Sequence, residues 1–316
     1  MKIIRDSDDQ RVDAAVLTTG AFDGVHVGHQ MVIGKVIERA KERGVCSAVV
    51  TFDVHPATVV RPDSAPKLLT RLPRKLELLE ELGIDVVYII EFDEERANTT
   101  AEQFVDEVFV GRLGAQEILV GSDFNFGKGR EGTVDFLADH GTRNGFTVEG
   151  LDLLRRQETA TEPVSSTAIR RALVGGDIET AAIMLGRPFE AWGEVVQGDQ
   201  RGRTIGFPTA NVLLEDDRAR PANGVYACRY VEPDGTEHAA AVNVGVRPTF
   251  YDSADTVVLE AHLLDFPAAG ESGDLYGQHA KVQFLHFLRS ERRFNGIDEL
   301  KTQLELDIAD TRTALS

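Results

Sequence analysis

Apolar and polar residues follow two alternating patterns along the first half of the chain. Four short runs are rich in Val, Ile and Leu and contain few polar residues, which is typical of strands buried on both faces of a sheet. These runs are AAVLTTG (14–20), VCSAVVTFD (45–53), DVVYIIEF (85–92) and QEILVGSDF (116–124). In the intervening segments, apolar residues recur at every third or fourth position, which predicts amphipathic helices.

Three such helices are predicted, and a glycine follows each of them as an end signal. They cover residues 32–40, 74–82 and 100–112, with Gly44, Gly83 and Gly114 beyond their ends. Strands and helices in alternation predict a parallel sheet with right-handed crossovers, and so a Rossmann-like, doubly wound α/β domain. In such a sheet, ligands bind beyond the carboxyl ends of the strands.

The pattern changes after Gly186-Arg187-Pro188, where short strands with alternating apolar residues begin. Six of them are predicted: WGEVVQ (192–197), FPTANVLL (207–214), GVYACRY (224–230), HAAAVNVGV (238–246), TVVLEAHLL (256–264) and HAKVQFLHFL (279–288). Apolar residues at helical spacing from Ile297 to Ile308 close the chain. The second half is therefore predicted to be a small antiparallel β-barrel with a terminal α-helix, and the predicted domains are residues 1–186 and 187–316.

Composition narrows the functional classes. The 316 residues include 42% hydrophobic residues and carry a formal net charge of −18. This charge argues against nonspecific binding to nucleic acid or to an anionic membrane, since both require basic fields. The charged opening MKIIRDSDDQ does not resemble a signal peptide, so a cytoplasmic location is expected. Cys46 and Cys228 lack metal-ligand spacing and are expected to be reduced core residues.

The stretch AFDGVHVGHQ (21–30) follows the first predicted strand and suggests a site for a phosphate. Its glycines allow the backbone to approach an anion, and the helix that follows directs its free amides to the same point. Two alternatives stay open. His26 and His29 could bind zinc together with Asp53 or His55, or they could be polar capping residues without a chemical role.

Four segments in this order resemble the motifs of prokaryotic bifunctional riboflavin kinase/FAD synthetases. The first is GAFDGVHVGH (20–29), which is similar to the His-x-Gly-His signature of nucleotidyltransferases. The others are TFDVHP (51–56), GSDFNFG (121–127) and SSTAIR (165–170). The chain departs from the family's usual residues at Ala21, Val54 and Asn125, none of which replaces a charged reacting group.

The resemblance implies that the N-terminal domain transfers AMP from ATP to FMN and releases pyrophosphate. His26 and His29 then hold the ATP phosphates during the transfer, and Asp123 contacts FMN. The further ATP-binding positions that the resemblance implies are Gly20, Phe22, Asp23, Gly28, Ser165, Ser166, Thr167 and Arg170.

The second half resembles a riboflavin kinase. The segment FPTAN (207–211) is similar to that family's Pro-Thr-Ala-Asn motif, in which Thr209 and Asn211 bind Mg²⁺ and the nucleotide. Glu260 matches the catalytic glutamate that accepts the proton of the attacking riboflavin hydroxyl. The resemblance further implies that Gly202, Arg203 and Gly206, in the loop before this motif, contact ATP. It also implies that Arg289 and Arg292, in the segment 287–294, contact the flavin.

Taken together, these resemblances imply riboflavin, FMN and FAD as substrates or products, ATP as co-substrate and Mg²⁺ as cofactor. Small molecules are the expected partners, without nucleic acid or membrane, and weak self-association stays open. Two competing hypotheses are a nucleotidyltransferase with another substrate and a flavin carrier without catalysis. His262 is interpreted as a strand histidine with an ordinary partner, and residues 266–277 as a surface insertion without catalytic effect.

Overall fold

The computed structural model describes residues 1–152, 163–198, 201–247, 256–266 and 275–316, and these divide into two compact units. The first unit comprises residues 1–166 and the second comprises residues 167–316. The predicted domain boundary at residues 186 and 187 stays a prediction. The predicted insertion at residues 266–277 lies largely outside the described residues.

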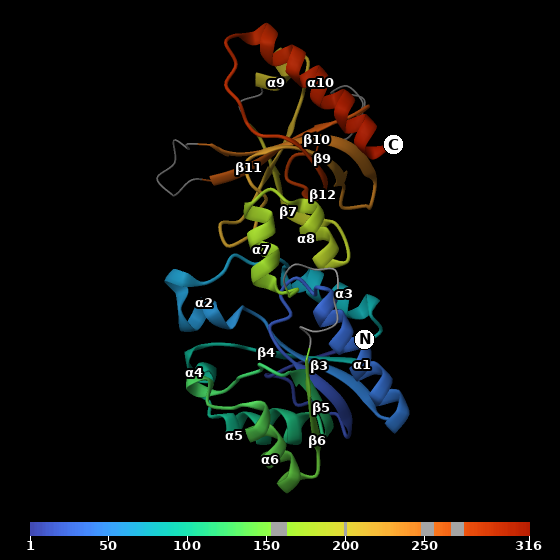
Figure 1. Ribbon diagram of the computed structural model, residues 1–316, viewed down its shortest axis with the longest axis vertical. Coiled ribbons are helices and arrows are strands. Elements are labelled where there is room, and N and C mark those ends of the chain that lie inside the picture. The colour runs from blue at the N-terminus through green and yellow to red at the C-terminus, as the bar shows by residue number, and fades with distance from the viewer. Residues whose placement is uncertain (153–162, 199–200, 248–255, 267–274) are drawn as a thin grey trace. The chain divides into compact units, whose positions relative to one another are not determined.

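The first unit is built on a six-stranded parallel sheet with the order β1-β4-β3-β2-β5-β6 (Figure 1). The four central strands are those that the apolar runs predict, and the flanking strands β1 and β6 are additional. Their bounds are β1 (Lys2–Arg5), β2 (Ala15–Thr19), β3 (Cys46–Phe52), β4 (Val86–Ile90), β5 (Ala115–Gly121) and β6 (Thr147–Leu151). The edge strands were missed because they lie at the margins of the sheet and include exposed residues, so they lack a long apolar run.

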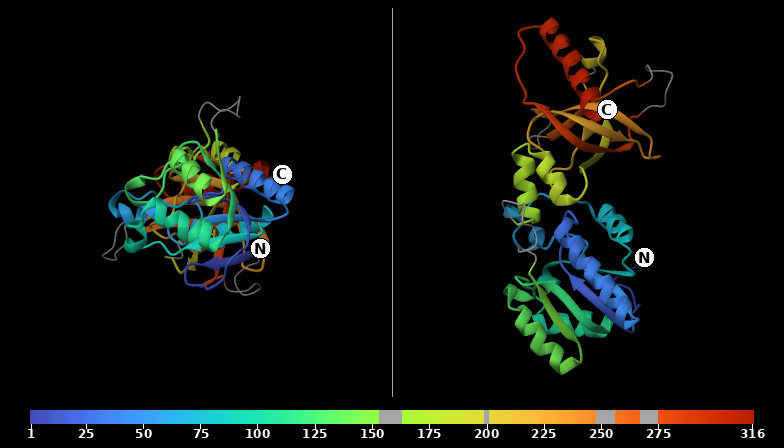
Figure 2. Two further views of the ribbon diagram at one scale, coloured as in Figure 1. Left: turned by 90° about the horizontal axis from the view of Figure 1, so that it is seen from below. Right: turned by 45° about the vertical axis from the view of Figure 1, so that its right-hand side comes forward.

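Helices cover both faces of this sheet, and the right-hand view of Figure 2 shows α1 and α6 on opposite sides. The predicted helices are observed as α1 (Val27–Arg43), α3 (Leu72–Glu81) and α5 (Ala101–Phe104), and α5 continues into the π-helical segment η2 (Val105–Arg112). Those not predicted are α2 (Pro56–Val60), α4 (Glu94–Ala97), α6 (Val134–Asn144) and the 3₁₀ turns η1 (Pro62–Ser64) and η3 (Lys128–Arg130).

Two apolar cores lie on the two faces of the sheet. One packs strand residues such as Val16 and Val87 against Ile33 of α1 and Leu79 of α3. The other packs the opposite strand face against residues of α5, η2 and α6, including Phe109. This two-sided burial explains why the central strands read as uninterrupted apolar runs.

The strand order places a topological switch point between β2 and β5. From β2 the chain moves through α1 to β3 on one side, and it later returns to place β5 on the other side of β2. Adjacent crossovers that leave a strand in opposite directions open a crevice at its carboxyl end. The segment AFDGVHVGHQ begins at that end of β2, and GSDFNFG begins at the same end of β5.

The second unit begins with α7 (Ser166–Val174), whose first residue belongs to the first unit, and α8 (Ile178–Leu185). A closed barrel of six strands follows in the order β10-β11-β8-β7-β12-β9 (Figure 1). Its elements are β7 (Phe189–Val196), the short helix α9 (Arg201–Thr204), β8 (Ala210–Leu213), β9 (Gly224–Val231), β10 (Glu237–Arg247), β11 (Thr256–Leu263) and β12 (His279–Arg289). All neighbouring strands are antiparallel, so both parts of the predicted fold class are confirmed.

Alternation along β11 divides its residues between the inside and the outside of the barrel. Leu259 and Ala261 are fully buried, whereas Glu260 and His262, which alternate with them, are partly exposed. The closing helix α10 (Ile297–Leu315) contacts β9, β10 and β12. It therefore lies against the outer surface of the barrel, and the pocket described below forms between them.

Candidate functional site

The first candidate site lies where β2 ends and α1 begins. The chain makes a sharp turn there, with φ of 49° at Phe22, 87° at Gly24 and 39° at Val25. Positive φ values are unfavourable for Phe and Val, so the surroundings must hold this loop in place. Gly20 at the start of the loop donates a backbone hydrogen bond to Val50 O at 3.1 Å.

Two histidines open helix α1 and are stacked on each other. His26 is buried and is the N-cap residue, and its Nδ1 accepts a hydrogen bond from the backbone N–H of His29 at 3.3 Å. Because that Nδ1 must be unprotonated to accept, His26 presents Nε2–H as its donor. The ring centroids of His26 and His29 are 3.5 Å apart, with 16° between the ring planes.

His29 is held as a neutral imidazole. Burial, the neighbouring His26 and the ammonium of Lys75 together hold its pKa well below the ordinary value of 6.5. Its Nδ1 is buried without a hydrogen-bond partner, and the edge of the ring packs against Phe22 at 5.1 Å between centroids. A buried polar atom without a partner is rare in folded proteins and is consistent with a group kept available for a ligand.

Asp23 fixes the loop to a neighbouring segment. Its buried carboxylate accepts hydrogen bonds from the backbone N–H groups of Leu69 and Thr70 at 3.0–3.1 Å. The geometry therefore gives Asp23 a role in holding the loop, and contact with ATP stays a prediction.

The structure brings the later hydroxyl motif to the same loop within the first unit. Ser166 Oγ donates a hydrogen bond to Asp23 O at 2.8 Å, and the space beside the Cα of Gly28 is bounded by the His26 ring and by Val164 O. Ser166 therefore lies beside the loop that carries the histidines, and contact of Ser165 and Ser166 with ATP stays a prediction. Thr167 and Arg170 lie on α7 in the second unit, and their contact with ATP stays a prediction.

The other polar residues at this edge of the sheet have local partners. Asp53 accepts a hydrogen bond from Phe92 N at 3.0 Å, and His55 caps α2 through its Nδ1. Asp123 is exposed beyond β5, where Asn125 Nδ2 donates to its backbone oxygen at 2.7 Å. Among the residues that the structure describes, no group of three His, Cys, Asp or Glu side chains could hold a metal ion. The zinc alternative therefore lacks a ligand set there.

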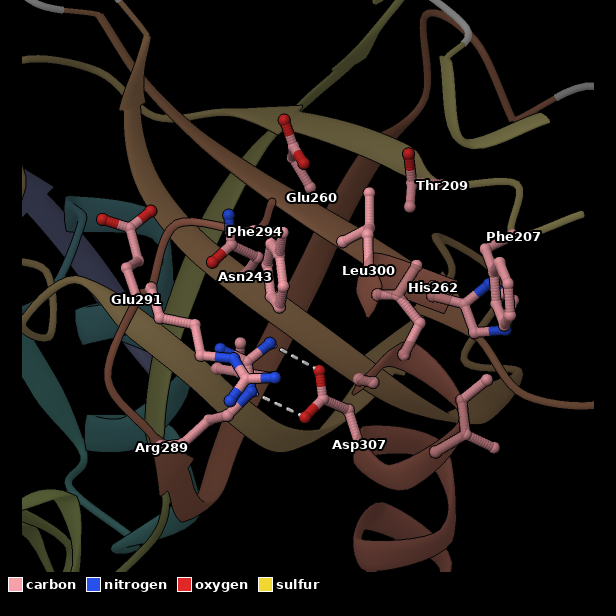
Figure 3. A pocket seen from close by; sticks show the side chains of 15 residues that line it. Phe207, Thr209, Asn243, Glu260, His262, Arg289, Glu291, Phe294, Leu300 and Asp307 are labelled. Atoms are coloured by element: carbon pink, nitrogen blue, oxygen red, sulfur yellow. Dashed lines mark hydrogen bonds and ion pairs between the residues drawn. The ribbon is translucent and has the colours of Figure 1, made fainter. Parts of the chain in front are cut away.

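The second candidate site is an open pocket of about 210 Å³ between the outer surface of the barrel and α10 (Figure 3). Apolar residues of α10, including Leu300 and Leu304, form one wall, and polar residues of β10 and β11 form the other.

A row of polar side chains crosses three neighbouring strands of the barrel. Glu260 of β11 pairs directly with Asn243 of β10 on one side and with Asn211 of β8 on the other. Directly paired residues point to the same face of a sheet, so the three side chains share the outer surface. Thr209 also lines the pocket (Figure 3).

The oxygen donors in this row suit a magnesium ion. Mg²⁺ prefers oxygen ligands, and it commonly takes one or two from the protein and the remainder from phosphates and water. The Asn211 carboxamide on β8 and the Thr209 hydroxyl just before β8 offer such oxygens, and the Glu260 carboxylate of β11 lies opposite Asn211. The residues present therefore fit this ion.

Arg289 and Arg292 both line the pocket, but each has a partner within the protein. The guanidinium of Arg289 makes two hydrogen bonds of 2.7 Å to the buried carboxylate of Asp307 on α10. Arg292 lies 4.9 Å from the centroid of the Phe294 ring and 3.8 Å from Glu299. Arg289 thus joins β12 to α10, and flavin contact by either arginine stays a prediction.

The glycine-rich loop is described only in part. The backbone oxygen of Gly202 accepts a hydrogen bond from Phe207 N at 2.8 Å, and a Cβ at residue 202 would lie 2.3 Å from Phe207 O. Only glycine therefore fits at this position of the turn, and Gly206 has a φ of 94°. The side chain of Arg203 lies outside the described residues.

Several site residues were not found by sequence reasoning. Lys75 lies beneath the first loop, and Asn243, Glu291 and Asp307 line or support the pocket. Asn243 carried a usable signal, because it is a polar residue between two apolar ones in a predicted strand. The position of Lys75 on a predicted helix carried no such signal. His262 has a partner as expected, since its Nδ1 is 2.8 Å from Pro208 O.

Polar groups are thus gathered at two places, the switch point of the parallel sheet and the outer face of the barrel. The chain is a two-domain protein of the α/β-plus-barrel class, with a polar site in each unit. Comparisons with known proteins make this specific. Residues 8–168 match the family model for FAD synthetase, and residues 185–315 match the model for riboflavin kinase.

Curated relatives cover both halves. The chain is 39% identical over 295 residues to the bifunctional riboflavin kinase/FMN adenylyltransferase of Bacillus subtilis. The aligned region covers 93% of this chain and 90% of the relative. It is 40% identical over 319 residues to the protein of that name from Pseudomonas fluorescens, with 99% and 97% coverage. The chain therefore belongs to the family of bifunctional riboflavin kinase/FMN adenylyltransferases, and the predicted resemblance is confirmed.

A solved structure has the same fold over the full length. It is described as a macrolide-efflux protein from Streptococcus pneumoniae, with a TM-score of 0.84, 28% sequence identity and 99% coverage of both chains. Among the described residues, none of the helices is both long and apolar enough to cross a lipid bilayer.

Proposed function

We propose that this chain phosphorylates riboflavin to FMN in its second unit and converts FMN to FAD in its first unit, using ATP in both reactions. Membership of the family supports the pair of reactions. One observation supports the assignment of each reaction to its own unit: the two polar sites are separate. His26 and His29 lie at the switch point of the sheet in the first unit, and Glu260 lies in the barrel pocket of the second unit.

In the first unit, an oxygen of the FMN phosphate attacks the α-phosphorus of ATP, and the bond to pyrophosphate breaks. The protein contributes position and charge stabilisation rather than a covalent intermediate. His26 and His29 stand together at the start of α1, and neutral His29 can donate an N–H from its unpartnered Nδ1 to a phosphate oxygen. The free amides at the start of α1 add a partial positive charge at the same place.

In the second unit, the terminal hydroxyl of riboflavin attacks the γ-phosphorus of ATP, and the bond to ADP breaks. Glu260 accepts the hydroxyl proton, which is a task suited to a carboxylate that lines the pocket. Asn243 and Asn211 flank Glu260 in the strand register and hold polar groups beside it. Leu300, Leu304 and Phe294 provide apolar surface for a flavin ring.

Thr209 and Asn211 would hold Mg²⁺ in the second unit, beside the carboxylate of Glu260. When bound, this ion neutralises charge on the phosphates of the nucleotide. Gly202 and Gly206 keep the preceding turn compact, so that its backbone can approach those phosphates.

The partners in this proposal are small molecules. A net charge of −18 disfavours nucleic acid, because binding it requires clustered positive charge. We place the enzyme in the cytoplasm, where riboflavin and ATP are both available, and we propose at most weak self-association. Analytical ultracentrifugation of the full chain tests the last point.

A crossover of two variants tests the division of labour. Glu260→Gln should lower riboflavin phosphorylation by on the order of 10²-fold or more and leave the conversion of added FMN to FAD unchanged. His29→Asn should do the reverse. Both rates are measured by chromatography of the flavins with ATP and Mg²⁺.

Glu194→Gln is the matched control, because Glu194 is an exposed glutamate on another barrel strand. It should leave both rates unchanged. Loss of both activities in one folded variant would contradict the assignment of the reactions to separate units. Retention of riboflavin phosphorylation in Glu260→Gln would contradict the role of Glu260.

A further inference from the structure

Lys75 is a buried lysine within the first unit. It belongs to α3, and only 7% of its surface is exposed. Lysine is rarely buried to this degree unless its ammonium group is fully paired, because desolvation of a charge is costly. The position of this ammonium therefore needs an explanation.

The ammonium group of Lys75 joins the ends of two neighbouring strands. It donates hydrogen bonds to Ala21 O at 2.9 Å, to Thr51 Oγ1 at 3.2 Å and to Phe52 O at 3.4 Å. Ala21 follows β2, whereas Thr51 and Phe52 end β3. Three acceptors match the three N–H donors of an ammonium group, so its hydrogen bonding is complete.

The loop that Lys75 holds is the one that carries the two histidines. Ala21 directly precedes the left-handed turn at Phe22, Gly24 and Val25, and His26 follows. Ala21 O accepts a second hydrogen bond, from Thr51 Oγ1 at 3.3 Å. Such a strained turn persists only where several contacts fix it, and Lys75 supplies one of these contacts from below.

Lys75 also adds a fixed positive charge beneath the loop. Its neighbours with charge or titratable groups are the carboxylates of Asp23 and Asp53 and the imidazole of His29, which is itself stacked on His26. Burial lowers the pKa of Lys75 to about 8, and the two carboxylates oppose this effect. The same ammonium helps to keep His29 neutral.

We propose that Lys75 is a positioning residue for the adenylyl transfer: its buried ammonium fixes the loop that carries His26 and His29 for contact with the nucleotide phosphates. This rests on the proposed function of the first unit. Lys75 acts through the loop and does not itself touch the substrate.

Replacement of Lys75 by methionine tests the proposal. Lys75→Met keeps a long side chain but removes the charge and the three donors. The conversion of FMN to FAD should fall on the order of 10²-fold, since small displacements of catalytic groups have effects of this size. Riboflavin phosphorylation, measured in the same preparation, should not change. Lys41→Met, at an exposed lysine of α1, is the control and should leave both rates unchanged.

The pH profile distinguishes positioning from a merely structural role. Below pH of about 8 the wild-type ammonium donates all three hydrogen bonds, and above it the neutral amine donates only two. Wild-type kcat/KM for FMN adenylylation should therefore fall as pH rises through about 8, and Lys75→Met should lack this fall. A Lys75→Met protein that keeps the wild-type rate, or keeps the alkaline fall, overturns the proposal.

Two further measurements apply if Lys75→Met does not fold. The first is the pH profile of the wild type, in which the absence of a fall in kcat/KM for FMN adenylylation near pH 8 overturns the proposal. The second is the rate of FMN adenylylation in Thr51→Val, which overturns the proposal if it is unchanged. A wild-type chain that makes no FAD from FMN would instead refute the proposed function. The two failures are thus distinguishable.

Discussion

At the scale of single residues, the first site depends on two imidazoles with different surroundings. His26 has a defined partner for Nδ1, which leaves Nε2–H as its donor. His29 is kept neutral by burial and by neighbouring positive groups. Two rings stacked at 3.5 Å between centroids cannot both carry a charge without strong repulsion. In the proposed adenylyl transfer, the pair would therefore contact phosphate through oriented neutral groups rather than through two full charges.

The titration of His29 is the prediction that belongs to this scale. In the folded chain, its pKa lies below 6.5, whereas an unfolded histidine takes up a proton near 6.5. The His29 ring signal in NMR spectra should therefore not shift between pH 8 and about pH 6.5. The first unit should also lose stability as pH falls below about 6.5, because the unfolded state then binds more protons.

The NMR signal of the His29 ring is identified as the one that is missing from the spectrum of His29→Asn. A His29 midpoint at or above pH 6.5 would contradict the neutral form. The hydrogen bonds from Lys75 and Thr51 go to the backbone oxygen of residue 21. They therefore do not depend on whether this residue is alanine or the asparagine that is usual in the family.

At the scale of elements, helix α1 is both a support for the sheet and the carrier of the site. Its glycines show this division. A Cβ at Gly28 would lie 3.2 Å from Nδ1 and 3.3 Å from Cε1 of the His26 ring, whereas a Cβ at Gly34 would meet no atom within 4 Å. A side chain at position 34 therefore affects only the stability of the helix, whereas one at position 28 also affects the position of the His26 ring.

Replacement of each glycine by alanine gives a matched pair of predictions. Gly34→Ala should stabilise the helix by about 1 kcal/mol and leave the conversion of FMN to FAD unchanged. Gly28→Ala should gain helix propensity but displace the His26 ring, so that FMN adenylylation falls while the melting temperature is maintained. Full activity in Gly28→Ala would show that the His26 position is not critical.

Helix α10 completes the second site, and its attachment depends on Asp307. This buried carboxylate accepts hydrogen bonds from Arg289 and from Gln303 Nε2, the latter at 2.8 Å. Asp307→Asn would leave the partly exposed Arg289 without its counter-charge and should destabilise the second unit by about 3 kcal/mol. Since α10 forms one wall of the pocket, riboflavin phosphorylation should fall while FMN adenylylation persists.

Calorimetry and the two flavin assays measure this effect. Asp310→Asn, at an exposed position on the same helix, is the control and should behave like the wild type. Equal loss of both activities in Asp307→Asn would contradict a local effect on the pocket.

At the scale of the whole molecule, the net charge of −18 is spread over a chain that binds anionic substrates. Such a charge destabilises the compact state through self-repulsion, and salt screens it. The local donors at the two sites work within this acidic background, because a phosphate needs only a few well-placed partners.

Salt should therefore raise the thermal stability of the chain. The melting temperature at pH 7 should increase by several degrees when KCl is raised from about 0.01 M to about 0.15 M, as the Debye length falls from about 30 Å to about 8 Å. Near the pI of 4.9 the same step should have a smaller effect, because the net charge is close to zero. A melting temperature that falls with salt at pH 7 would contradict this account.

The sequence by itself determined the class of each half. Buried parallel strands have continuous apolar runs, and barrel strands alternate, so four central strands, three helices, six barrel strands and the closing helix were predicted correctly. The motifs identified the family because their residues are local in sequence. Elements without a continuous apolar run, such as β1 and β6, were missed.

Only the tertiary structure decided how distant side chains meet. Lys75 reaches Ala21 and Thr51 because α3 packs against the sheet, and Asp307 meets Arg289 because α10 lies on the barrel. Likewise, Asn211, Glu260 and Asn243 form a row because strand register aligns them. Periodicity along the chain records which face of an element is buried, but it carries no information on which other element covers that face.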